Sequence, residues 1–184
     1  MSTRESKLHA LNIAQLRTTR NTIRPAARQA AIESLDAMVA SAIDLALAAR
    51  QANWNVRGSQ FSALHEVFGR TSDELYKHAD VLAERSAALG GIPRCSPQSV
   101  VAATKLKSYP SFGVDGAEHV AELAARLANL STELRQAIID INHQGDPVTA
   151  HLFTGAGATV DHLLWLMESQ APFDESGRAT KVLA

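Results

Sequence analysis

The sequence predicts an all-α protein, a four-helix bundle with a long crossover between helices 2 and 3. Alanine and leucine are abundant, and aromatic residues make up only 5% of the 184-residue chain, a composition that favours helices over strands. Four segments repeat apolar residues in steps of three and four, which is the spacing of one helix face. The connection between the second and third segments is long, which indicates a crossover instead of a hairpin.

The first predicted helix begins at Pro25, since proline suits a helical first turn. Its apolar face comprises Ile32, Leu35, Val39, Ala42, Ala46 and Ala49. The next position on this face is Asn53, a polar amide whose burial is unfavourable unless it is paired. Two interpretations stay open: Asn53 is buried and paired, or the helix frays there into the Asn55–Gly58 turn.

The second predicted helix follows a break at Arg57-Gly58-Ser59, and Ser59 is predicted to cap it. Its apolar face comprises Phe61, Leu64, Phe68, Leu75, Ala79 and Leu82. Beside this face runs a mostly polar stripe of His65, Gly69, Ser72, Tyr76, Asp80 and Glu84. Such a helix commonly packs against its own bundle and against a partner subunit as well. Gly90-Gly91 and Pro93 are predicted to end it.

The crossover runs from Ile92 to Asp115, and a short helix is predicted within Ser99–Lys105. The third helix then aligns Val120, Leu123, Leu127, Leu130, Leu134 and Ile141. The fourth, from about Val148 to Gln170, aligns Phe153, Ala156, Val160, Leu163 and Met167. Short first and third connections around a long middle one are the connectivity of a ferritin-like bundle.

The chain divides into three predicted parts. Residues 1–24 form a basic N-terminal arm that is expected to be mobile, with a short helical piece near 8–16. Residues 25–172 form the bundle, and residues 173–184 form a C-terminal tail. A chain of this length is expected to hold a single domain.

Charge is unevenly distributed, although the formal net charge is only −1. Residues 1–28 hold six Lys and Arg against one Glu, and the rest of the chain is acidic. The arm is therefore expected to reach an anionic partner; the alternative is a solvated tail that aids solubility. Its basic residues are Arg4, Lys7, Arg17, Arg20 and Arg24.

The sequence also indicates a compartment. Cys95 is the only cysteine, which excludes an internal disulfide and fits a reducing environment. The N-terminus lacks the apolar region of a signal peptide, and no apolar run approaches the ~18 to 20 residues of a membrane span. We expect a cytoplasmic protein with no membrane partner.

The polar stripe of the second helix carries the best candidates for metal chemistry. Asp80 and Glu84 share one helix face, but His65 lies about 22 Å from Asp80 along the axis. A metal–ligand bond is about 2 Å long, so one chain cannot bring all three to one ion. Two copies of this helix, antiparallel about a two-fold axis near Glu74 and Leu75, would set His65 of one opposite Glu84 of the other. A shared site would then form at each end of the pair.

A simpler interpretation stays open. Carboxylates four residues apart are usually surface groups, and a single histidine near an apolar face is usually a hydrogen-bonded core residue. Arg85, next to Glu84, is predicted to form a structural ion pair or to tune that carboxylate.

Two segments of the chain resemble a known family. QANWNVRGSQFSALHEVF from residue 51 and HADVLAERSAALGG from residue 78 look like the signature of the Dps proteins (DNA-binding protein from starved cells), the bacterial mini-ferritins. LKSYP at 106–110 and DHLLWLMES at 161–169 extend the resemblance over residues 8–172. It implies a shell of twelve identical subunits with two-fold and three-fold interfaces and a diiron ferroxidase centre at each two-fold. It also implies Fe(II) oxidation by hydrogen peroxide, storage of ferric mineral, and DNA binding through the basic arm at the nucleoid.

The resemblance assigns five ligand positions, here Asn53, His65, Gly69, Asp80 and Glu84. Asn53 stands where the family has an imidazole and Gly69 where it has a carboxylate. An amide is a far poorer iron ligand, and glycine offers none. His65, Asp80 and Glu84, which match the family, could hold one metal ion. The second iron would be weakly bound or would depend on a substitute ligand such as Asp73.

Two further residues take roles by resemblance. Trp54 is implied as an electron donor to the oxidant; alternatively it is a large core anchor. Asp161 is implied to line an acidic three-fold pore; alternatively it is an ordinary exposed Asp.

We expect a Dps-like cage that stores iron and protects DNA, with an atypical and weakened ferroxidase centre. Whether the protein is an enzyme stays open. The alternative is a non-enzymatic cage for DNA compaction or iron sequestration, with the centre lost. A helical interaction module without metal is a third, remoter alternative.

Overall fold

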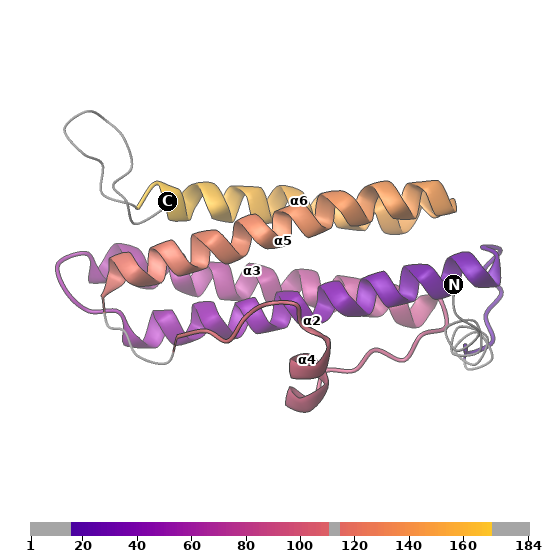
Figure 1. The fold of residues 1–184 in the computed structure, drawn as a ribbon, viewed down its shortest axis with the longest axis horizontal. Helices are drawn as coiled ribbons and strands as arrows, with labels where there is room; N and C mark the ends of the chain where they lie inside the picture. Colours follow the sequence, from indigo (N-terminus) through magenta and orange to yellow (C-terminus); the bar gives the residue numbers. More distant parts are fainter. Residues whose placement is uncertain (1–15, 111–114, 171–184) are drawn as a thin grey trace.

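The computed structural model describes residues 16–110 and 115–170. Over these residues the helices are α2 (Pro25–Asn55), α3 (Phe61–Ala88), α4 (Pro97–Ala103), α5 (Gly116–Gln144) and α6 (Pro147–Glu168). One hairpin of α2 and α3 packs against a second of α5 and α6, and α4 lies outside the bundle against α2 (Figure 1). The predicted four-helix bundle is confirmed, and so is its crossover with a short helix.

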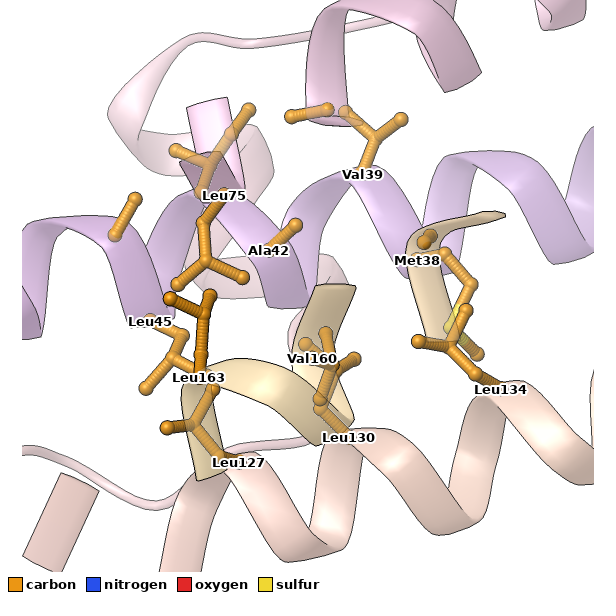
Figure 2. Close-up of a cluster of buried hydrophobic side chains, with 14 of the residues drawn as sticks. Met38, Val39, Ala42, Leu45, Leu75, Leu127, Leu130, Leu134, Val160 and Leu163 are labelled. Atoms are coloured by element: carbon orange, nitrogen blue, oxygen red, sulfur yellow. The ribbon is translucent and has the colours of Figure 1, made fainter. Parts of the chain in front are cut away.

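The predicted apolar faces meet in one core. Every residue predicted on the apolar faces of α2, α5 and α6 is buried, and so are five of the six on α3. Figure 2 shows Leu45 of α2, Leu127 of α5 and Leu163 of α6 within one cluster of buried side chains. Each such side chain contributes about 1.5–3 kcal/mol on burial.

Phe61 is the exception on α3, because its side chain is 46% exposed. It begins the helix at the end of the bundle, and its ring contacts His65 at a centroid distance of 5.2 Å. The helical period was right, but the core, which includes Leu64 of the same turn, does not cover the first residue of the helix.

Two helix starts differ in how they are capped, and one of them tests the predicted cap at Ser59. Ser59 does not cap α3: it lies in a turn closed by the bond from the Phe61 amide to the Gly58 carbonyl, and Gln60 takes the cap position without a side-chain bond. At α6, by contrast, the Asp146 carboxylate accepts from the Thr149 amide at 3.0 Å.

Polar contacts tie the crossover to both hairpins. Thr104 donates its hydroxyl to the Asp44 carboxylate of α2 at 2.8 Å. Tyr109 shares a 2.6 Å hydrogen bond with Nδ1 of His119 on α5, and the Arg126 guanidinium lies 5.1 Å from the Tyr109 ring centre. The long connection therefore has a fixed course along the bundle where it is described.

The part of the arm that is described packs against the bundle near the end of α3. Residues 16–24 have no regular helix, and the Arg17 amide donates to the Gly90 carbonyl at 2.9 Å. Gly90 has φ +96°, and a Cβ there would lie 2.6 Å from the Arg17 carbonyl oxygen, so glycine is required. Arg17, Arg20 and Arg24 are exposed.

Several expectations fall outside the described residues. These are Arg4, Lys7, nearly all of the helical piece near residues 8–16, and the tail over 173–184. Among the helices that are described, none is both long and apolar enough to cross a membrane.

Candidate metal centre

Asn53 lies in the last turn of α2, where it faces the second turn of α3. Its side chain is buried, at 5% exposure, and its Nδ2 donates to the His65 carbonyl at 2.6 Å. The helix continues to Asn55, so the fraying interpretation is wrong and the buried, paired interpretation is right. The amide now links the two helices of the hairpin.

Gly69 lies directly in front of this amide. A Cβ built on Gly69 would approach Asn53 Nδ2 to 3.2 Å, a tight contact that requires the amide to shift by a few tenths of an ångström. The two positions that depart from the family pattern therefore touch each other. The Asn53 side chain fills the space in front of Gly69, so they form one local arrangement.

Arg50 is a neighbour that the sequence did not single out. It forms an ion pair with Asp73, the residue suggested as a substitute ligand. Both line a shallow open depression of about 380 Å³ together with Asn53, His65, Glu66, Gly69, Arg70, Glu74 and Lys77. The sequence could have indicated Arg50 as a neighbour of the site, because Arg50 and Asn53 are three residues apart and therefore lie on one side of α2. The ion pair uses one Asp73 oxygen, so a metal at Asp73 would share this carboxylate with the Arg50 guanidinium.

The kept ligand residues are accessible but separated. His65, Asp80 and Glu84 are all exposed on α3. No group of three or more His, Cys, Asp or Glu side chains gathers within the described part of one chain. This agrees with the distance argument: a single subunit presents one imidazole at one end of α3 and two carboxylates toward the other. One nitrogen and two carboxylate donors suit a ferrous ion when they meet across a two-fold contact.

Arg85 does not pair with Glu84. Its guanidinium donates to both carboxylate oxygens of Asp146 at 2.9 and 3.1 Å, and to the Thr149 hydroxyl at 3.0 Å. The side chains of Arg85 and Asp146 are 13% and 0% exposed. Consecutive residues point to different sides of a helix, so Arg85 faces α6 while Glu84 faces solvent. Glu84 is left open for a ligand.

Trp54 and Asp161 both lie on the surface. Trp54 is 75% exposed, so in the single chain it is not a core anchor. Asp161 is paired: the Arg135 guanidinium donates to it at 2.9 Å, and the Ser131 hydroxyl donates to its other oxygen. If Asp161 lines a pore for iron, it does so while paired with the positively charged Arg135 guanidinium.

Comparisons with known proteins identify the family of the chain. The profile of the ferritin-like domain family matches residues 32–171. A "DNA protection during starvation protein" of Agrobacterium fabrum is 39% identical over 151 residues, which cover 82% of this chain and 93% of the relative.

Solved structures match the fold. DpsA14 from Streptomyces coelicolor superimposes with a TM-score of 0.82 at 27% identity, covering 91% of this chain and 98% of that one. A Mycobacterium smegmatis Dps structure gives 0.83 at 21% identity, covering 89% and 98%. With a ferritin-like domain over most of its length and a relative this close, the chain belongs to the Dps family of ferritin-like proteins.

Proposed function

We propose that this chain assembles into a Dps-type cage of twelve subunits that takes up iron and protects DNA, with a weakened ferroxidase centre. The observation that carries the weakening is the contact between the two substituted positions: Asn53 donates to the His65 carbonyl and fills the space at Gly69. The amide is committed to the α3 backbone, and glycine supplies no ligand.

Fe(II) is the substrate in this proposal. His65 of one subunit and Asp80 and Glu84 of its two-fold partner would hold one ion, because these three side chains are exposed. The second ion would lack both an imidazole and a carboxylate. Arg50, paired with Asp73 at the edge of the same depression, adds a positive charge that disfavours a second cation.

Iron oxidation tests the weakened centre. We expect the unmodified protein to oxidise Fe(II) with hydrogen peroxide slowly, and the variant with Asn53→His and Gly69→Asp to be at least tenfold faster. His at 53 removes the amide that a side chain at 69 would meet. Stopped-flow absorbance of the ferric product measures both rates. Full oxidation of two Fe(II) per site by the unmodified protein, at the rate of the double variant, would contradict the proposal.

The second candidate is a cage without a working centre, which the Arg50–Asp73 ion pair favours. It predicts no metal at the two-fold contact. Anomalous scattering from an iron-soaked crystal separates the two: density held by His65, Asp80 and Glu84 supports the weakened centre, and its absence supports the non-enzymatic cage. A low-order oligomer in light scattering would contradict both.

DNA binding is assigned to the basic arm, which places the protein at the nucleoid in the cytoplasm. Three exposed arginines, Arg17, Arg20 and Arg24, lead into an acidic bundle that phosphate should repel. Binding should fall steeply with salt. A variant lacking residues 1–23 should shift DNA far less in a gel assay; an equal shift would remove the arm from the proposal.

A further inference from the structure

Tyr109 and His119 form a pair of side chains outside the proposed set of iron ligands. The Tyr109 hydroxyl shares a 2.6 Å hydrogen bond with Nδ1 of His119, and the two rings are nearly parallel, with an interplanar angle of 6°. His119 is 5% exposed, and Tyr109 packs against the core. Burial raises the pKa of the Tyr109 phenol, so the hydroxyl keeps its proton. In the tautomer of neutral imidazole with an unprotonated Nδ1, the phenol donates to it.

Two contacts place this pair beside the end of α3 that carries His65. The His119 ring meets the Phe68 ring edge-on at a centroid distance of 6.0 Å. Phe68 follows His65 by three residues, which is about 4.5 Å along the helix axis. The Pro110 carbonyl accepts from the Gln51 side chain at 3.2 Å, which ties the crossover to the last turns of α2. One ring and one turn of helix therefore lie between His119 and His65.

Charged groups near the phenol offset one another. The Arg126 guanidinium lies 5.1 Å from the Tyr109 ring centre and donates to the Ser108 carbonyl at 3.1 Å. It also donates to the Glu122 carboxylate at 2.8 Å. After burial, which is the largest cause, the Glu122 carboxylate raises the pKa of Tyr109 and the Arg126 guanidinium lowers it. A positive charge gained by His119 would therefore meet a balanced ion pair and not an isolated cation.

A centre that holds one iron ion lacks an electron for its oxidant. Reduction of hydrogen peroxide to the level of water takes two electrons, and one Fe(II) gives only one. Without a second donor, the oxygen–oxygen bond breaks to hydroxide and a free hydroxyl radical. The need for a second donor rests on the proposed function, in which the second iron is weakly held.

We propose that Tyr109 supplies this second electron and passes its phenolic proton to Nδ1 of His119. Fe(II) and Tyr109 each give one electron to the peroxide, and its oxygen–oxygen bond breaks. The products are Fe(III), two hydroxide ions, a neutral tyrosyl radical and the His119 imidazolium. A second Fe(II), bound after the Fe(III) has left, reduces the radical, and the proton returns to the phenol. One site thus oxidises two Fe(II) per peroxide, one after the other.

Freeze-quench electron paramagnetic resonance tests this proposal on the assembled protein, mixed with Fe(II) without oxygen and then with hydrogen peroxide. We expect a tyrosyl signal that narrows when the protein carries ring-deuterated tyrosine. The chain holds one other tyrosine, Tyr76, which is 40% exposed on α3. Tyr109→Phe should lower the signal at least tenfold, whereas the matched change Tyr76→Phe should leave it unchanged.

Spin trapping of hydroxyl radical provides a readout that should rise. Tyr109→Phe should release several-fold more trapped radical per Fe(II) oxidised than either the unmodified protein or Tyr76→Phe, because the second donor is gone. His119→Gln keeps an acceptor for the phenol but no base for its proton, so it should lower the tyrosyl signal although Tyr109 is present. Light scattering checks the assembly of each variant. Tyr76→Phe decides the question even without Tyr109→Phe, because Tyr109 is then the only tyrosine.

Three results would overturn the proposal. The first is a tyrosyl signal that Tyr76→Phe removes or Tyr109→Phe leaves unchanged, and the second is a radical that ring-deuterated tyrosine does not narrow. The third is iron oxidation without any protein radical, which would leave the proposed iron centre standing. An absence of iron oxidation in the unmodified protein would instead contradict the iron centre, and the role of Tyr109 with it.

Discussion

The two ends of α3 hold their polar side chains in opposite ways. Toward its C-terminal end, Arg85 donates hydrogen bonds to Asp146 and Thr149 in a network with little access to solvent. Toward its N-terminal end, His65 is exposed beside an open depression, and only the Asn53 amide is buried. A closed network with every group paired stabilises the fold, whereas open groups stay available for binding. Stability should therefore be sensitive at one end of α3, and iron chemistry at the other.

The largest expected effect is at the closed end. Asp146→Ala removes the partner of the nearly buried Arg85 and the cap of α6, and should lower the free energy of unfolding by about 3–5 kcal/mol. Asp115→Ala is the matched control, since Asp115 caps α5 through the Ala117 amide but is exposed, and should cost only about 1 kcal/mol. Urea denaturation measures both. Equal losses would reduce the role of Asp146 to capping.

The pH dependence of the same pair is the next effect. Burial alone would raise the pKa of Asp146, but hydrogen bonds from Thr149 and the Arg85 guanidinium outweigh it and hold the pKa below its usual 3.8. A lowered folded-state pKa gives stability that is present above 3.8 and lost as pH falls through the folded value. The difference in unfolding free energy between unmodified protein and Asp146→Ala should thus stay constant from about pH 7 to about pH 5 and shrink as pH falls below about 4. A constant difference would rule out the charge as its source.

A smaller effect is expected at the open end. Asn53→Ala removes the bond to the His65 carbonyl and should cost about 1 kcal/mol. Asn55→Ala is the control two residues on: Asn55 is exposed and donates only to Gln51 of its own helix, so its loss should stay within about 0.5 kcal/mol of zero. Thermal unfolding compares them. If the two variants match, the Asn53 amide does not hold the hairpin together.

The smallest effect tests the contact between the two substituted positions. In an open helix interior, Gly→Ala stabilises by about 1 kcal/mol, and Gly155 of α6, with nothing within 4 Å of an added Cβ, should show this. Gly69→Ala should gain less, because its Cβ meets Asn53 Nδ2 at 3.2 Å. The gain should return when Asn53→Ala is also present. Additive changes in this double-mutant cycle would mean that the two positions are not coupled.

The fold could be predicted in detail from the sequence because helix periodicity is a local property. Steps of three and four placed Leu35, Leu127 and Leu163 on buried faces, and the structure buries all three. The error at Phe61 has the same origin, since periodicity gives the direction of a side chain but not where the core ends along the helix axis. Ser59 failed as a cap because the turn at Gly58 delays the helix start by one residue.

The site could be predicted only in part. The spacing of His65 and Asp80 was enough to exclude a metal site within one chain, since helix rise is fixed. The partners of Arg85 and Arg50 were missed because they lie 61 and 23 residues away. Ion pairs over such distances depend on how the helices pack.

By itself, the sequence determined the helices, their apolar faces, the crossover and the separation of the candidate ligands, because each follows from local geometry along one chain. Only the tertiary structure decided that Asn53 is buried and bonded to α3, that it occupies the space at Gly69, and that Arg50 holds Asp73. Those contacts depend on the register between α2 and α3. Register is set by the packing of the whole hairpin and not by any residue alone.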